Sequence, residues 1–467
     1  MSRPPAHFDR SLVDGPIAQG VWKLAWPTMV QNMVGGLQGV IDHALVGHFV
    51  GYTANAAIGV AWQIALVVIV FITSLYTGMA VLVARHAGAN QPDEVNRVFM
   101  QATMASLFMG LVILAPAGYL LSPWLLGLVH AAPEVRAQAL PFLRIFFLGS
   151  SGMLLFFMIG GALRAAGDAR TPMRLGVALT VLNITFNVVL ITGVGPLPAL
   201  GTRGSALGTV LASLVVVVYG FMKIRSGKLV VRWPAEGWWG PDWTVIRGLF
   251  RFGLPAGLQG VAMNIGGVLL LRYIGSLRES AEAQAAFAVG YTELFSFITW
   301  TSVGLMGATA TMVGQNLGAG KPERCDAAVR VAARFGLAIA ATIGALFIVM
   351  PRALLGIFGM TDGAVVPLGV GLLRYLAISG FFITVALAYT GALQGAGDTR
   401  SPLVISIVSQ VALPIGVCAV LEAWGMLNAS WIWRAIVAGH VTRCALSVTR
   451  FRQGRWRAID VVRAVKR

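Results

Sequence analysis

Long apolar runs separated by short polar segments dominate this chain. A helix crosses about 30 Å of hydrocarbon with roughly 20 residues, at a rise of 1.5 Å each. Twelve runs predict such helices, with approximate bounds 24–49, 55–83, 98–121, 138–162, 172–193, 204–222, 250–275, 284–313, 328–350, 367–393, 402–420 and 428–449. Because these runs are continuous and do not alternate, they predict an all-α integral membrane protein with twelve transmembrane helices and exclude a barrel.

Basic residues predict how the spans are oriented, because Lys and Arg are in excess on the cytoplasmic side of membrane helices. With the N-terminus inside, 27 of the 35 Lys and Arg residues fall at the inner face and 8 at the outer face. This split predicts a multi-pass protein of the cell inner membrane with both termini in the cytoplasm. The polar first twenty residues show no apolar stretch with a cleavage site, so we expect the first run to be a retained helix.

Composition agrees with a lipid-covered surface. The chain has 57% hydrophobic and 11% charged residues, whereas a soluble domain carries roughly 25% charged residues. The formal net charge of +17 is spread between apolar runs, so we expect the lipid bilayer as a partner and no nucleic acid. His, Cys and acidic residues form no catalytic or metal-ligand pattern, and no repeated filter loop suggests a channel. We therefore expect no enzyme, no cofactor and no metal site other than that of a coupling ion. We also expect the protein to function as a monomer.

The chain contains one unit twice. GALRAAGDARTP (161–172) recurs as GALQGAGDTRSP (391–402), and HAGANQPDE (86–94) recurs as NLGAGKPER (316–324), both at an offset of 230. This predicts two pseudo-symmetric six-helix lobes: an N-lobe (1–222), a cytoplasmic linker (223–247) and a C-lobe (248–467) with a basic cytoplasmic tail. Two such bundles that rock about a site between them are typical of secondary transporters.

Smaller features of these segments carry structural predictions. In each repeated loop, Gly-Asp followed by Pro predicts a helix end, a cap and the first turn of the next helix. The linker is rich in Trp (Trp233, Trp238, Trp239, Trp243), which we expect at the inner interface.

Two acidic residues fall inside predicted spans, Asp42 and Glu293. Asn183 and Asn187, spaced by four residues, share a face of the fifth span, and Thr209 lies in the sixth. All four, Asp42 included, lie roughly 7–14 Å below the outer boundary, at 1.5 Å per residue. Carboxylate, amide and hydroxyl oxygens are ligands that hard cations prefer, so these residues predict a proton or sodium site.

A plainer explanation is that the two asparagines only hydrogen-bond between helices. Asp42 does not fit that explanation as well, because an unpaired carboxylate at membrane depth takes up a proton. A side chain whose protonation changes with hydration is what proton coupling requires.

Glu293 suggests where substrate could bind. The repeat offset places it opposite Gln63, and aromatic and Met side chains such as Tyr291 and Met306 lie nearby in the sequence. These residues are candidates for a cavity that accepts flat cationic compounds. Such stripes also occur where helices face lipid or pack in a core, and the sequence leaves this alternative open.

At these residues the chain resembles the MATE (multidrug and toxic compound extrusion) transporters over essentially its whole length. The resemblance rests on PTMVQNMVGGLQGVIDHALVGHFVG (27–51), VGQNLGAGKPE (313–323), the paired GAL..AGD.R.P loops and RFRQGRWR (450–457). It is closest to the prokaryotic DNA-damage-inducible-F branch at its N-lobe polar residues. The resemblance implies efflux of small organic compounds by exchange for H+ or Na+, with Asp42 as the coupling residue.

Two departures from the family bear on the coupling ion. Some members carry Asp where this chain has Asn187, and the sodium-type branch also uses acids in helices 7 and 10. Residues 250–275 and 367–393 contain no Asp or Glu. This favours proton antiport of organic, often cationic compounds by alternating access. The alternative is a flippase for lipid-linked saccharides from the same wider superfamily.

Overall fold

The structure is a computed structural model that describes residues 8–129, 131–194, 198–233, 240–361, 363 and 365–461. Within these ranges the chain consists of helices and short connections, and no residue is in a β-strand. This confirms the predicted all-α class. It also follows from the solvent, because a helix satisfies its own backbone hydrogen bonds where lipid offers none.

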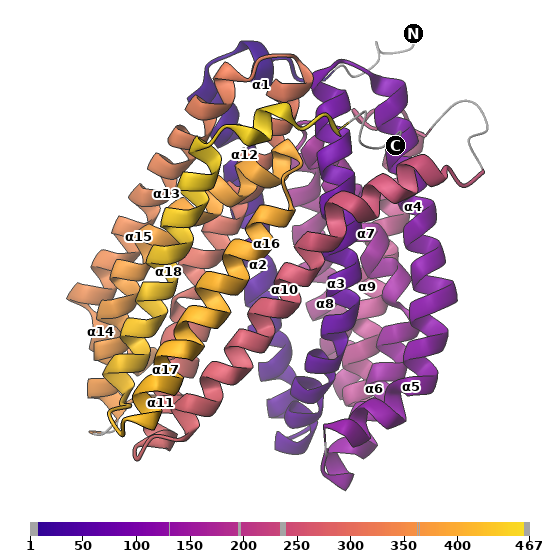
Figure 1. Cartoon of the computed structure of the whole chain (residues 1–467). Helices are drawn as coiled ribbons and strands as arrows, with labels where there is room; N and C mark the ends of the chain where they lie inside the picture. The colour runs from indigo at the N-terminus through magenta and orange to yellow at the C-terminus, as the bar shows by residue number, and fades with distance from the viewer. Residues whose placement is uncertain are drawn as a thin grey trace. The chain divides into compact units, whose positions relative to one another are not determined.

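Twelve long helical segments follow one another along the described chain (Figure 1). Eight are continuous: α2 (Ile17–Phe49), α3 (Tyr52–Gly88), α8 (Arg170–Thr192), α9 (Thr202–Arg225), α10 (Trp243–Gly275), α13 (Glu323–Val349), α15 (Val365–Ala396) and α18 (Ala429–Arg452). Four consist of consecutive pieces: α4 (Pro92–Phe108), η1 (Met109–Leu114) and α5 (Ala115–Leu128); α6 (Pro133–Leu148) and α7 (Ser150–Ala165); α11 (Ser280–Phe287), η2 (Ala288–Leu294) and α12 (Ser296–Gly318); α16 (Arg400–Ser406), η3 (Ile407–Ala412) and α17 (Leu413–Ala423). Short helices are α1 (Ser11–Asp14), α14 (Pro351–Ile357) and η4 (Arg455–Ala458). Each predicted span coincides with one long segment.

Fewer than twelve helices qualify as membrane spans by length and apolarity alone. Among the described residues, 8 helices are long and apolar enough to cross a membrane, or 9 if α6 and α7, bent by 48° at their junction, form one span. The long segments that fall short are α2, α11–α12 and α18, which carry the polar side chains discussed below. A helix that turns polar groups toward the protein interior loses mean hydropathy without losing its capacity to span.

The residues group into two compact units. Unit 1 comprises residues 1–10, 30–257 and 461–467, and unit 2 comprises residues 11–29 and 258–460. The division falls inside α2 and α10, two residues after Pro27 and Pro255, which interrupt the backbone hydrogen bonding of these helices. The beginning of α2 thus groups with unit 2, which the repeat did not suggest. The lobe bounds 1–222 and 248–467 stay predictions.

The repeated loops have the conformation that their sequence predicts. Gly167 and Gly397 adopt positive φ angles of 104° and 93°, which a residue without a Cβ tolerates best. Asp168 Oδ1 accepts the backbone N–H of Thr171 at 3.0 Å, in the first turn of α8. Asp398 does the same for the N–H of Ser401 at 3.2 Å, so the predicted cap is confirmed in both copies.

The described part of the linker is held against α4. Gln101 donates to Gly240 O at 2.9 Å and accepts from the Asp242 N–H at 2.9 Å. Burial disfavours the charged carboxylate of Asp242, but hydrogen bonds from Arg97 and from the Val245 and Thr244 backbone outweigh it and lower the Asp242 pKa. Of the predicted interfacial tryptophans, Trp233 packs edge-on against Phe221, and Trp243 is 72% exposed. Trp238 and Trp239 lie outside the described residues.

Candidate cation-coupling site

One face of α8 is polar and turned into unit 1. Thr180, Asn183 and Asn187 follow one another at spacings of three and four residues, which places them on one side of the helix. Both asparagine side chains are completely buried. A buried amide needs hydrogen-bond partners, and side chains of α2 and α9 supply them.

The four residues predicted to form the site are joined in one chain of hydrogen bonds. Asn187 Nδ2 donates to Asp42 Oδ1 at 2.7 Å and contacts Asn183 Oδ1 at 3.3 Å. Asn183 Nδ2 donates to Thr209 Oγ1 at 3.0 Å, and this hydroxyl donates to the Ser205 carbonyl at 3.1 Å. The structure therefore brings the predicted residues together, from α2 and from the consecutive helices α8 and α9, which lie more than 120 residues further along the chain.

Glycines let α8 and α9 approach closely enough for this chain to form. A Cβ on Gly204 would lie 2.4 Å from Leu190 O, and a Cβ on Gly208 would lie 2.1 Å from Asn187 Oδ1. Neither position has room for a larger side chain. Gly208 thus provides the space in which the Asn187 side chain turns toward Asp42.

The donor and acceptor arrangement has a chemical consequence. The only carboxylate of the cluster, Asp42, makes no ion pair with Lys or Arg among the residues that the structure describes. Its Oδ1 is already occupied by an amide N–H. Asn187 Oδ1, in contrast, is a buried acceptor without a donor. A sodium ion needs several oxygens directed at it, whereas this cluster directs N–H groups at its carboxylate, so it suits a proton better.

Sequence reasoning missed several polar partners of this region. Thr180 donates to Gln38 Oε1 at 2.8 Å, and Arg164 donates to Gln31 Oε1 at 2.7 Å. The signal was present, because Gln31, Gln38 and Asp42 are spaced by seven and four residues and share one face of α2. His43 lies off this face and pairs with Asn55 Oδ1 at 2.6 Å. Arg164 is 9% exposed, so its side chain is covered by protein at the end of α7.

The predicted substrate-cavity residues divide between the two units. In unit 1, Gln63 is exposed. In unit 2, Tyr291 and Met306 are partly buried and pack against a hydrophobic core, while Glu293 is partly exposed in the π-helix η2. Tyr291 and Met306 thus pack in a core, which was the alternative interpretation of these residues. A role in substrate binding stays a prediction for all four residues, Gln63 and Glu293 included.

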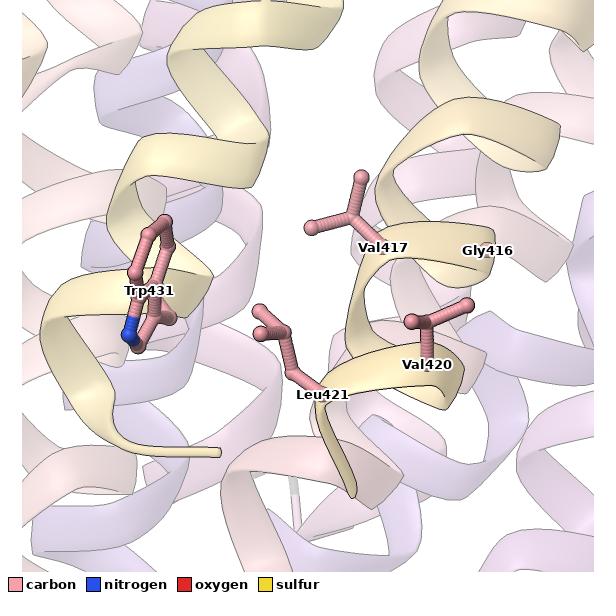
Figure 2. Close-up of a pocket in the computed structure, with 5 residues that line it drawn as sticks. All are labelled: Gly416, Val417, Val420, Leu421 and Trp431. Carbon is pink, nitrogen blue, oxygen red and sulfur yellow. The ribbon is translucent and has the colours of Figure 1, made fainter. Parts of the chain in front are cut away.

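A pocket of about 300 Å³ lies between α17 and α18 of unit 2. Figure 2 shows Gly416, Val417, Val420 and Leu421 on one helix and Trp431 on the other. Its lining is apolar and carries no ionisable group, so it is not a site for a coupling ion. Among the described residues, no three His, Cys, Asp or Glu side chains are close enough to hold a metal ion.

These observations define a class of protein. An all-helical membrane chain with a lone carboxylate and its amide partners inside one helical bundle is typical of an ion-coupled carrier.

The chain belongs to the MatE family, which matches residues 27–189 and 255–420. It is 26% identical to the probable multidrug resistance protein NorM of Thermotoga maritima over 93% of this chain and 92% of that one. It is also 26% identical to the multidrug resistance protein PmpM of Pseudomonas aeruginosa, over 94% and 92% of the two chains. A solved outward-facing structure of a multidrug resistance MATE family transporter shares the fold, with a TM-score of 0.87, 21% identity and 98% of each chain covered. The family consists of transporters and not of enzymes.

Proposed function

We propose that this chain is a secondary multidrug efflux carrier of the cell inner membrane, which exports small organic, often cationic compounds in exchange for protons. Asp42 is the coupling residue. The supporting observation is its carboxylate in α2, without a basic partner among the described residues and hydrogen-bonded to the buried amide of Asn187 at 2.7 Å. The names of the multidrug resistance relatives support the class of substrate.

The hydrogen-bond chain suggests how protonation of Asp42 changes the contacts of α8 and α9. An ionised Asp42 only accepts, and it accepts from Asn187 Nδ2. A protonated Asp42 carries an O–H donor, and Asn187 Oδ1 is the buried acceptor that lacks one. A turn of the Asn187 amide would satisfy both atoms but would break its contact with Asn183 Oδ1. Protonation is thereby transmitted from α2 to α8, and through Asn183 and Thr209 to α9.

Alternating access places the two protonation states on opposite sides of the membrane. With both termini in the cytoplasm, Asp42 takes up its proton from outside and substrate leaves. Release of the proton to the cytoplasm restores the carboxylate and allows the next substrate to bind. The carrier acts as a monomer in this scheme, since all four site residues come from one chain.

The alternative of a flippase for lipid-linked saccharides would require arginines free to hold a pyrophosphate. Two arginines near the predicted outer ends contact aromatic side chains instead. Arg144 lies over the Tyr119 ring at 4.4 Å, and Arg434 lies over Trp431 at 4.7 Å and donates to Tyr375. This favours the drug carrier.

The decisive experiment is efflux of a fluorescent organic cation in everted vesicles, driven in turn by a pH gradient and by a sodium gradient. Asp42→Asn keeps the shape and loses the charge, so we expect it to abolish pH-driven efflux at normal expression. Asp93→Asn, the same change at an exposed position, is the matched control and should transport normally. Wild-type efflux by the Asp42 variant would refute the assignment, and efflux driven only by sodium would replace the proton as coupling ion.

A further inference from the structure

Unit 2 contains a buried positive charge without a visible counter-charge. Arg443 is 2% exposed, and no carboxylate in the described part of the chain pairs with it. Its Nε atom is buried without a hydrogen-bond acceptor. Arg443 lies nine residues, about 13 Å along the helix, before the end of α18 at Arg452.

Two further polar side chains without partners share the face of Arg443. His440 and Ser447 precede and follow it by three and four residues and are 2% and 0% exposed. His440 Nδ1 and Ser447 Oγ are both buried without a hydrogen-bond partner. Buried polar atoms are nearly always satisfied in native proteins, so three buried donors and acceptors on a single helix face make this a place where a polar ligand can bind.

The free-energy cost of burying an unpaired charge also favours a bound ligand beside Arg443. A guanidinium stays charged in proteins, and an unpaired charge inside a membrane protein is costly unless it binds something of opposite sign. Tyr291, the group that interacts electrostatically with Arg443, is a neutral phenol at neutral pH. The part of the chain that the structure describes therefore supplies no negative charge at this place.

Aromatic rings enclose the His440 side of this cluster. The His440 ring stacks on Tyr291 and Phe295, with centroids 6.5 and 5.6 Å apart. Tyr291 stacks on Phe287 at 4.9 Å, and Phe287 on Trp433 at 6.1 Å. Tyr291 lies in η2, a π-helix, and π-helical turns are often found at functional sites. Such an apolar enclosure strengthens electrostatic binding.

The repeat shows that this charge belongs to unit 2 alone. Helices α9 and α18 both have 24 residues, and their bounds differ by 227 at each end. In this register Val216 and Ser213 of α9 take the places of Arg443 and His440. Unit 1 instead carries the carboxylate of Asp42. The two copies thus differ in the charged side chains at these positions.

We propose that Arg443, His440 and Ser447 form a binding site for a small monovalent anion, either a halide or the carboxylate of a small acid. The guanidinium provides charge and N–H donors, and either the imidazole N–H or the serine hydroxyl can add a donor, since about 10 Å of helix rise separates His440 from Ser447. The ligand is limited in size because Arg443 and His440 are 98% covered by protein. This site is independent of the proposed proton coupling at Asp42.

The test measures the thermal stability of the purified full-length protein in sodium chloride, bromide, acetate and benzoate, against gluconate at equal pH and ionic strength. Selective binding raises the stability by mass action, and we expect a Tm increase of about 3–5 °C in saturating chloride or acetate. Arg443→Gln should remove this increase. Arg434→Gln, an exposed arginine on the same helix, should keep it. The Asp42→Asn variant should also keep it, which separates this proposal from the proposed function.

A structure determined in bromide gives a second readout, an anomalous peak beside the Arg443 guanidinium. This readout uses the wild-type protein, so it remains decisive if the Arg443 variant does not fold. Chloride and bromide acting without acetate would identify a halide site, and acetate acting as well would identify a carboxylate site. A wild-type Tm that is the same in all anions, or an anion effect that persists in Arg443→Gln, would overturn the proposal, as would stabilisation by benzoate alone.

Discussion

Replacing Gly208 by Ala tests whether the hydrogen-bond chain around Asp42 depends on close helix packing. The new methyl group would lie 2.1 Å from Asn187 Oδ1 and 3.2 Å from Asn187 Cγ. Its distance to the Asn187 backbone N would be 3.1 Å, so the backbone would have to give by a few tenths of an ångström. The Asn187 side chain must therefore move, and its Nδ2 atom, which donates to Asp42, moves with it.

The size of the effect follows from the two contacts that Asn187 Nδ2 makes. The bond to the Asp42 carboxylate contributes about 1.5–3 kcal/mol, and the contact with the neutral Asn183 oxygen about 1 kcal/mol at most. Alanine recovers about 0.5–1 kcal/mol of helix propensity relative to glycine. We expect a net loss of about 1–3 kcal/mol in stability. Because displacing a positioning group by about 1 Å typically costs two orders of magnitude in rate, efflux should fall at least tenfold.

The assay pairs thermal unfolding of the purified protein with pH-driven efflux in everted vesicles. Gly127→Ala is the matched control, because its added Cβ would meet nothing within 4 Å and the position is exposed. It should leave efflux unchanged and stability equal or slightly higher. A double-mutant cycle with Asn187→Ala isolates the contact: in that background Gly208→Ala should cost little. If Gly208→Ala lowered efflux and stability as much in the Asn187→Ala background as in the wild type, the contact with Asn187 would not be the cause. No change in the wild type would refute the dependence on close packing.

Two further predictions concern ion pairs outside the site. The Asp242 pKa is lowered, so its contribution to stability is complete above the unfolded value of about 4 and disappears as pH falls through the folded pKa. The difference in Tm between wild type and Asp242→Asn should therefore be constant above pH 5 and shrink toward pH 3, and a difference that grows in acid would contradict this. Asp398 is 7% exposed and accepts from Arg450 at 2.8 and 2.9 Å, so Asp398→Ala should cost about 2–4 kcal/mol by denaturant unfolding. Asp168→Ala, which removes only the cap in the other repeat, should cost about 1 kcal/mol, and equal costs would show that the ion pair is not the cause.

The comparison of the two units shows how a duplicated bundle acquires different halves. The capping loops are nearly unchanged between the copies, because helix ends require the same glycine and aspartate conformations in both. The buried polar side chains are not conserved between the copies: Asp42 is in one unit, and His440 and Arg443 are in the other. Proton coupling and anion binding, if both are confirmed, would then be assigned to separate units of one carrier.

The sequence alone determined the features that depend on solvent and on local geometry. Continuous apolar runs required membrane helices, since lipid leaves the backbone no other way to satisfy its hydrogen bonds. The constant offset required a duplication, and Asp42, Asn183, Asn187 and Thr209 were found by depth, because helical rise is fixed at 1.5 Å per residue.

The tertiary structure decided which polar groups face one another. Depth does not specify helix rotation or the neighbour of each helix, so the pairing of Thr180 with Gln38 and the space at Gly208 were not predictable from the sequence. The burial of Arg164 and Arg443 was not predictable for the same reason, because a count of basic residues at each membrane face does not specify which helices pack over them. Helix geometry determines which residues of one helix share a face. The packing of the helices determines which residues of different helices come into contact.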